Sequence, residues 1–165
     1  ETPLTVPGTY RIVARGSDAL DAATVQAERL GYRVRRLECE GEAREVGREH
    51  AALALAAAPG TAFISGGELT VTVRGEGIGG PNQEYALAAA LALAGRPEIC
   101  GLAADTDGID GYSYAAGAFF EGGDPAGAQA ALDDNDSTMW FARRGDLFVT
   151  RPTGTNVNDL RIILT

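Results

Sequence analysis

The sequence contains no lysine, and all 14 of its basic residues are arginine. Its 23 acidic residues outnumber them, which gives a formal net charge of −9 at pH 7. Proteins that bind nucleic acid place basic patches against the phosphate backbone, so this balance argues against a nucleic-acid partner. The lack of lysine also excludes a P-loop, whose lysine reaches the nucleotide phosphates. A phosphate site here must therefore take its side-chain cation from arginine, from a metal ion or from outside the chain.

Cysteine and histidine are almost as scarce. Cys39 and Cys100 are too few and too far apart for a zinc knuckle or a disulfide framework, and we expect both to be reduced, half-buried thiols. The one histidine, His50, falls on the apolar stripe of an expected helix without an acidic or cysteine partner at catalytic spacing, so we expect a packed side chain. Ser65 and Ser113 lack a nucleophile elbow, which argues against a serine hydrolase.

Long hydrophobic runs are missing too. No apolar stretch approaches the roughly 20 residues needed to cross a bilayer, and the N-terminal region lacks the basic-then-apolar pattern of a leader peptide. We therefore expect a cytoplasmic protein without a membrane partner. Because the chain begins with Glu1 and not with methionine, we expect further residues ahead of it in the natural protein.

The sequence is rich in glycine, with 22 residues clustered in turns between alternating strand and helix patterns. These patterns predict a three-layer α/β/α domain with a mixed, largely parallel sheet at residues 9–165, after a linker or entering arm at residues 1–8. The expected strands are 10–14, 33–38, 61–65, 69–74, 99–104, 147–149 and 160–164. The expected helices are 18–30, 42–58, 82–94, 125–132 and 137–143, and 115–120 is a short helix or strand. Strands 10–14 and 33–38 are expected to be parallel, and 61–65 with 69–74 an antiparallel hairpin.

The stretch from Gly75 to Glu84 combines four glycines with the expected start of a helix, at which Pro81 takes the first position. Such a turn gathers backbone N–H groups at the positive end of the helix dipole, an arrangement that suits a phosphate or carboxylate. The alternative is a glycine-rich hairpin or linker turn. The spacing of the glycines is not that of the dinucleotide fingerprint.

Two further polar loops accompany this turn. Asp105, Asp107 and Asp110 fall within six residues, and one or two such carboxylates with waters are able to hold Mg²⁺; the alternative is a turn in which they accept backbone N–H groups. Residues 153–159 carry hydroxyl and amide groups suited to a small polyhydroxy acid, or to a turn that they stabilise themselves. Because ligands bind beyond the carboxyl ends of strands in open α/β sheets, we expect the glycine turn and the acidic loop to share one edge.

Several segments together resemble the C-terminal, so-called MOFRL, domain of the glycerate 2-kinases, many of which carry the older name putative hydroxypyruvate reductase. The segments are Ser65–Glu68, Gly75–Glu84, Thr106–Gly111, Asn135–Ser137, Gly145–Leu147 and Pro152–Leu160. The resemblance covers nearly the whole chain. It implies ATP- and Mg²⁺-dependent phosphorylation of D-glycerate at its 2-hydroxyl, in a cleft shared with an N-terminal Rossmann-like domain that this sequence lacks. It leaves a homodimer open, and it implies no appreciable turnover by these residues alone.

The resemblance also implies roles for individual residues. The catalytic and metal-binding carboxylates would be Asp107 and Asp110. Phosphate would be bound by Gly77, Gly79, Gly80, Asn82, Gln83 and Glu84. Substrate would be bound by Thr106, Thr153, Thr155, Asn156 and Asp159. Two positions depart from the family pattern, because Ile78 replaces an arginine of the turn and Asp105 replaces a glycine.

Two other functions stay open. A nicotinamide-dependent hydroxypyruvate reductase would need a dinucleotide fingerprint and a hydride-competent acid, neither of which the sequence shows. A non-catalytic anion-binding module is the second, and Ile78 favours it because an arginine there would be the obvious partner of phosphate oxygens.

Overall fold

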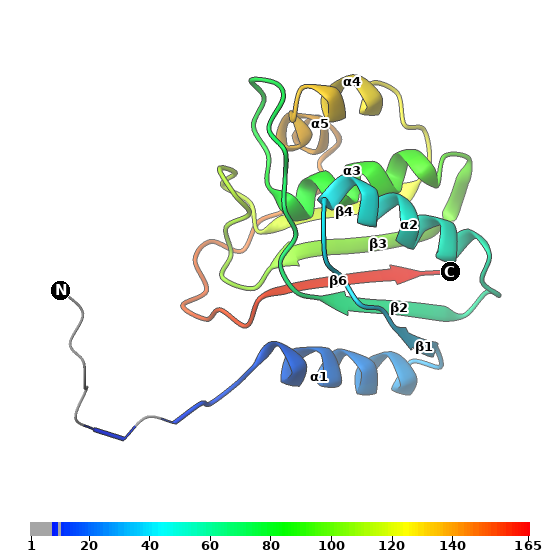
Figure 1. Ribbon diagram of the computed structural model, residues 1–165. Coiled ribbons are helices and arrows are strands. Elements are labelled where there is room, and N and C mark those ends of the chain that lie inside the picture. Colours follow the sequence, from blue (N-terminus) through cyan, green and yellow to red (C-terminus); the bar gives the residue numbers. More distant parts are fainter. Residues whose placement is uncertain (1–7, 10) are drawn as a thin grey trace.

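The structure is a computed structural model that describes residues 8, 9 and 11–165. Figure 1 shows helices around a twisted sheet. The helices are α1 (Gly16–Arg29), α2 (Ala43–Leu55), α3 (Pro81–Ala92), α4 (Ala128–Asp133) and α5 (Ser137–Arg144). The strands are β1 (Arg33–Arg36), β2 (Thr61–Gly66), β3 (Arg96–Asp105), β4 (Gly117–Gly122), β5 (Leu147–Phe148) and β6 (Asp159–Leu164).

The strands form one six-stranded sheet in the order β1-β2-β6-β3-β4-β5. The expected α/β class and mixed sheet are confirmed, and β1, β2, β3 and β5 run in one direction. Only the β1–β2 pair is parallel among the described strands, because the C-terminal strand β6 lies between β2 and β3 and runs opposite to both. Fewer neighbouring strands are therefore parallel than the sequence suggested.

The sheet separates two helical layers. Phe63 of β2 and Ile163 of β6 pack into the main core beneath α2 and α3, and α4 and α5 pack on α3. On the other face Leu20 of α1 lies against Gly66 of β2. This second layer is incomplete, because α1 contacts β1, β2 and β6 and leaves the outer face of β3 and β4 uncovered in the described chain (Figure 1). No helix in the described part of the chain is long and apolar enough to cross a bilayer.

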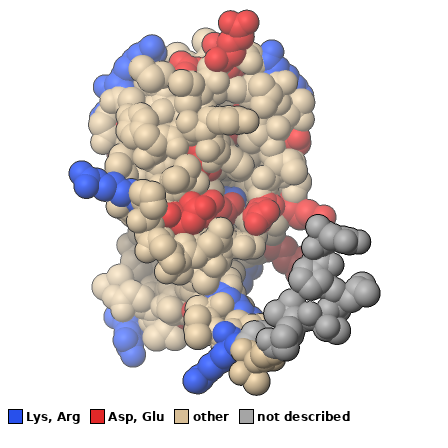
Figure 2. All heavy atoms as spheres, turned by 90° about the vertical axis from the view of Figure 1, so that its left-hand side faces the viewer, with Lys and Arg blue, Asp and Glu red and all other residues tan. Residues whose placement is uncertain are grey.

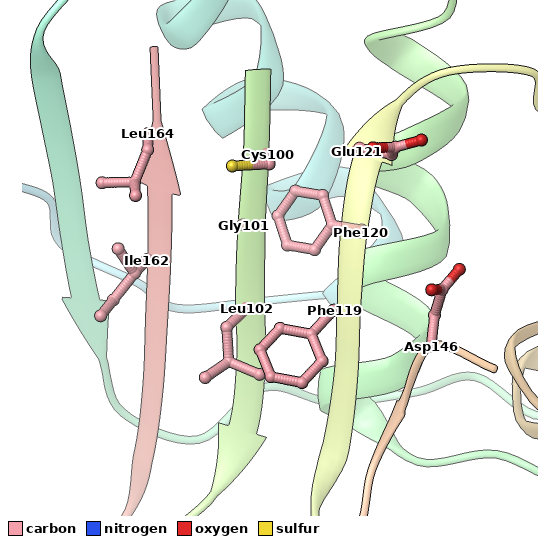
Figure 3. A pocket seen from close by; sticks show the side chains of 9 residues that line it. All are labelled: Cys100, Gly101, Leu102, Phe119, Phe120, Glu121, Asp146, Ile162 and Leu164. Atoms are coloured by element: carbon pink, nitrogen blue, oxygen red, sulfur yellow. The ribbon is translucent and has the colours of Figure 1, made fainter. Parts of the chain in front are cut away.

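The uncovered outer face holds an apolar hollow of about 400 Å³ (Figure 3). Its lining residues are Cys100, Gly101, Leu102, Phe119, Phe120, Glu121, Asp146, Ile162 and Leu164. The two carboxylates among them lie at one side, while the side chains of β3 and β6 in view are apolar apart from the Cys100 thiol. The hollow shares no residue with the three polar loops, so it does not belong to the site that they form.

Cys100 is exposed and Cys39 is partly buried, and both are free thiols.

Two expected strand pairings are not formed. Residues 69–74 do not form a hairpin with β2, because β1 and β6 already occupy both edges of β2; Thr70 instead makes an isolated bridge with Glu42. Residues 11–14 form no strand, so β1 pairs with β2 across α2 and has no parallel partner ahead of α1. The expected linker at residues 1–8 lies outside the described residues except for Gly8.

Close contact between α2 and α3 centres on Gly47. A Cβ atom at this position would lie 2.5 Å from the backbone oxygen of Tyr85 in α3. Glycine therefore sets the distance between the two helices that cover the core.

The first prediction tests this contact with one substitution at two positions of α2. Gly47→Val is expected to lower the free energy of unfolding by about 1–3 kcal/mol, because the added methyl groups must push the helices apart. Ala52→Val, on the exposed side of the same helix, should change it by only about 0.5 kcal/mol. Urea denaturation measures both values, and equal losses would show that the helices are not in tight contact.

Candidate functional site

The three polar loops meet at one end of the sheet. The carboxyl ends of β2 and β3, the beginning of β6 and the N-terminus of α3 surround a cavity of about 210 Å³. Its lining residues are Glu68, Leu69, Pro81, Asn82, Asp105, Asp110, Gly111, Asn156, Asn158 and Asp159. Figure 2 looks onto this end of the molecule and shows acidic side chains across its middle.

The acidic loop and the loop before β6 are joined by threonine hydroxyls. Thr106 Oγ1 donates to the backbone oxygen of Asn158 at 2.8 Å and accepts the backbone N–H of Val157 at 2.9 Å. Thr153 Oγ1 donates to the backbone oxygen of Thr106 at 2.6 Å, and the backbone N–H of Thr153 donates to the backbone oxygen of Asp107 at 2.9 Å. Two of the threonines assigned to substrate therefore also hold the two loops together.

The N-terminus of α3 is capped by Asp110. One carboxylate oxygen accepts the backbone N–H of Asn82 at 3.0 Å, and the other accepts that of Gln83 at 2.8 Å. The side-chain amides of Asn82 and Gln83 also donate to this carboxylate, at 3.3 and 3.0 Å. Asp110 is 1% exposed, and burial raises its pKa to about 6 despite these four donors. The chain's own carboxylate thus occupies the anion position that the sequence assigned to a phosphate.

The glycine turn packs against residues 134–136, which connect α4 and α5, and against Ser137, the first residue of α5. The backbone N–H of Glu76 donates to the Asp134 carboxylate at 3.1 Å, and that of Ile78 donates to Asp136 at 3.3 Å. A Cβ atom on Gly77 would lie 2.5 Å from the Cβ of Asp136. A Cβ atom on Gly79 would lie 2.3 Å from the Ser137 hydroxyl, and one on Gly80 would lie 2.3 Å from the backbone oxygen of Asp110. These glycines are explained by close packing.

Glu84 is turned into the protein. It is 2% exposed, and its carboxylate accepts Arg44 Nε at 2.7 Å and Asn135 Nδ2 at 2.8 Å. Gln83 is fully buried, and its side-chain oxygen accepts the Thr138 hydroxyl at 2.7 Å. The Glu84 carboxylate and the Gln83 side-chain amide are thus already hydrogen-bonded to other groups of the protein, which corrects their assignment to phosphate. The two residues fix the helix start against its neighbours.

Asp105 and Asp159 face each other across neighbouring strands. They are direct partners in the β3–β6 register and line the same cavity. Asp159 is 7% exposed and bonds the fully buried Arg161 guanidinium. Burial raises the pKa of both carboxyls, and Arg161 opposes the rise at Asp159. Both pKa shifts indicate surroundings in which negative charge is poorly solvated.

The remaining predicted residues lie on the outer side of the loops. A separate hollow of about 330 Å³ is bordered by Asp107, Thr155 and Asn156. Asn156 also lines the cavity of about 210 Å³, which we call the acidic cavity because four carboxylates line it. Asp107 accepts the Ile109 backbone N–H at 2.8 Å. Asp107 and Asp110 therefore line different hollows, and the structure does not bring them together as a pair of metal ligands.

Sequence reasoning missed the buried charges that support the site. Arg44 reaches Glu84 and the Leu132 backbone oxygen, and Arg161 reaches Asp159 and the Gly67 backbone oxygen. A signal was present for Arg161, because it is the one charged residue within the otherwise apolar expected strand 160–164. Nothing comparable in the sequence distinguishes Arg44 from the exposed arginines.

The second prediction concerns the buried Arg44–Glu84 pair. Glu84→Gln leaves the Arg44 guanidinium buried without its counter-charge, and the free energy of unfolding is expected to fall by about 3–5 kcal/mol. The control is Glu45→Gln, which breaks the solvent-exposed pair with Arg48 and should cost at most about 1 kcal/mol. Urea midpoints that match for the two variants would contradict the structural role of Glu84.

The third prediction concerns His50, whose Nδ1 lies 2.9 Å from the Tyr85 hydroxyl. Burial lowers the pKa of this histidine below its ordinary 6.5, so the unfolded chain takes up a proton before the folded chain does. The contribution to stability is present above pH 6.5 and is lost as the pH falls below it, by at most about 1.4 kcal/mol per pH unit.

The pH dependence has a direct control. His50→Gln should remove the part of the dependence between pH 7 and pH 5.5 that comes from this, the chain's one histidine. Asp110, whose pKa is about 6, contributes with the opposite sign and does so equally in both proteins. A proton NMR titration of the ring tests the same point in the folded protein. An imidazole that titrates freely near pH 6.5 would show that the ring is not buried.

Comparison with known proteins identifies relatives of this chain. A relative from Agrobacterium vitis named "Putative hydroxypyruvate reductase" is 44% identical over 187 residues, which cover 99% of this chain and 42% of the relative. The D-glycerate 2-kinase of Thermotoga maritima is 46% identical over 108 residues, covering 61% of this chain and 26% of the relative. The chain therefore spans less than half the length of these curated relatives.

A solved structure shares the fold. The crystal structure of glycerate kinase from Thermotoga maritima superposes with a TM-score of 0.86 at 37% identity, covering 93% of this chain and 41% of that one. Residues 61–159, which include all three polar loops, match the MOFRL family. The chain therefore belongs to the MOFRL family.

Proposed function

We propose that this chain is the C-terminal domain of a longer glycerate 2-kinase, which uses ATP and Mg²⁺ to convert D-glycerate into 2-phosphoglycerate. The observation that carries the proposal is the likeness to a glycerate kinase structure over 93% of this chain at 37% identity. The meeting of the three polar loops at one end of the sheet supports it, because this is where open α/β sheets bind ligands.

The loops offer groups for orienting glycerate. Phosphoryl transfer depends mainly on positioning and on neutralising charge. Thr155 and Asn156 are exposed on the loop before β6, and Thr106 and Thr153 hold that loop against Asp107. In this proposal the exposed hydroxyl and amide groups bind glycerate, and Asp107 accepts the proton of its 2-hydroxyl. Asp110, Gln83 and Glu84 act as positioning residues.

The negative charge of the site needs balancing cations from outside this chain. Four carboxylates line the acidic cavity, and the guanidinium of Arg161, which bonds Asp159, is buried away from solvent. An ATP molecule would add further negative charge, so Mg²⁺ and cationic side chains beyond this chain must balance it. We propose that a Rossmann-like N-terminal domain supplies those side chains. The 165 residues alone would then show no appreciable turnover.

A hydroxypyruvate reductase is the competing function. The name of the Agrobacterium vitis relative favours it. The described loops do not, because the N-terminus of α3, where a dinucleotide phosphate would bind in a Rossmann fold, is occupied by Asp110.

The fourth prediction separates the two activities in the full-length protein. ADP formation from ATP and D-glycerate is expected, without oxidation of NADH or NADPH by hydroxypyruvate. Asp107→Asn should lower kcat by about 10²-fold or more if this carboxylate is the proton acceptor. Asp133→Asn, an exposed substitution on α4, should leave kcat unchanged. Cofactor oxidation without ADP formation would overturn the kinase proposal.

A further inference from the structure

The acidic cavity contains an electrostatic conflict that the protein alone does not resolve. Asp105 and Asp159 lie directly opposite each other on β3 and β6, and like charges in this register repel. Glu68 and Asp110 add two further carboxylates to the lining. In the described part of the chain, the one guanidinium bonded to this group is that of Arg161, which bonds Asp159, so one positive charge faces four acidic groups.

An amide oxygen in the same cavity has no hydrogen-bond partner. Asn82 is 1% exposed and lines the cavity, and its Oδ1 makes no hydrogen bond in the described part of the chain. Its Nδ2 donates to Asp110, which fixes the side chain at the start of α3. A buried polar atom without a partner is uncommon in folded proteins and calls for a ligand or a water.

We propose that Asp105, Asp159 and the Oδ1 of Asn82 form a binding site for a divalent cation of the Mg²⁺ class. Carboxylate and amide oxygens are the ligands that such a hard cation prefers, and Mg²⁺ commonly keeps several waters beside one or two carboxylates. The cavity of about 210 Å³ has room for those waters, each of which takes about 30 Å³ in the liquid.

Two carboxylates are enough for such a site. The described residues contain no group of three or more His, Cys, Asp or Glu side chains arranged to hold a metal, which excludes an all-protein cage there. The site also differs from the pair Asp107 and Asp110 expected from the sequence. Both oxygens of Asp110 already accept N–H groups, and Asp107 lines another hollow.

The role of this cation rests on the proposed kinase function. A cation here would lie at the loops that we assign to glycerate and would balance the charge of the phosphates. Cation binding without nucleotide is a separate property. It is therefore measurable whether or not the protein phosphorylates glycerate.

The fifth prediction is a titration of the full-length, nucleotide-free protein with Mn²⁺, followed by the loss of the free-ion EPR signal. Wild-type protein should bind Mn²⁺, and Mg²⁺ should compete for it. Asp105→Asn should weaken the binding of one ion by at least about tenfold, because a charged ligand is lost. The substitution keeps Oδ1, which accepts the Asp107 N–H at 2.9 Å, so the loop should remain folded.

Asp107→Asn is the matched control, with the same substitution two residues away on the same loop. It should change Mn²⁺ affinity by less than about twofold while lowering kinase activity. Loss of the ion in Asp107→Asn but not in Asp105→Asn, or no Mn²⁺ binding by wild-type protein, would overturn the site. Normal Mn²⁺ results in a protein without kinase activity would instead overturn the proposed function alone. Urea denaturation of both variants checks that each is folded.

Discussion

The carboxylate of Asp110 is the contact on which the arrangement of the site depends. It binds the first two free backbone N–H groups of α3 and the side chains of Asn82 and Gln83, so it joins the acidic loop to the helix. A helix N-terminus attracts anions through its unpaired N–H groups and its dipole. Here the anion belongs to the protein. This contact sets the position of Asn82 and, through the loop, that of Asp105.

The surrounding contacts support the same helix end from other sides. Glu84 bonds Arg44 of α2 and Asn135 of the segment between α4 and α5, and the glycine turn lies against Asp134 and Asp136. The first turn of α3 is thereby held by three separate parts of the chain. The cavity beside this helix start is lined by four carboxylates, so it favours cations over free anions.

Local patterns predicted most of the elements but few of the contacts. Pro81 and the alanine-rich run after it marked α3, and the strand expected at residues 160–164 is β6. The hairpin of residues 69–74 was predicted wrongly, because the insertion of β6 beside β2 depends on residues nearly a hundred positions away. The shared edge of the glycine turn and the acidic loop was predicted from strand ends, although the strand expected before the glycine turn is not formed. The capping of α3 by Asp110 and the contact of Glu84 with Arg44 were not predicted, since both contacts join segments distant in sequence.

The Asp110 carboxylate caps α3, and we propose a cation site beside it between β3 and β6. Both are visible in a crystal structure of the full-length protein with Mn²⁺ and a non-hydrolysable ATP analogue, with anomalous data at the manganese edge. We expect Asp110 on the N–H groups of Asn82 and Gln83 and an anomalous peak between Asp105 and Asp159. A phosphate group on those N–H groups, with manganese bound by Asp107 and Asp110, would contradict both.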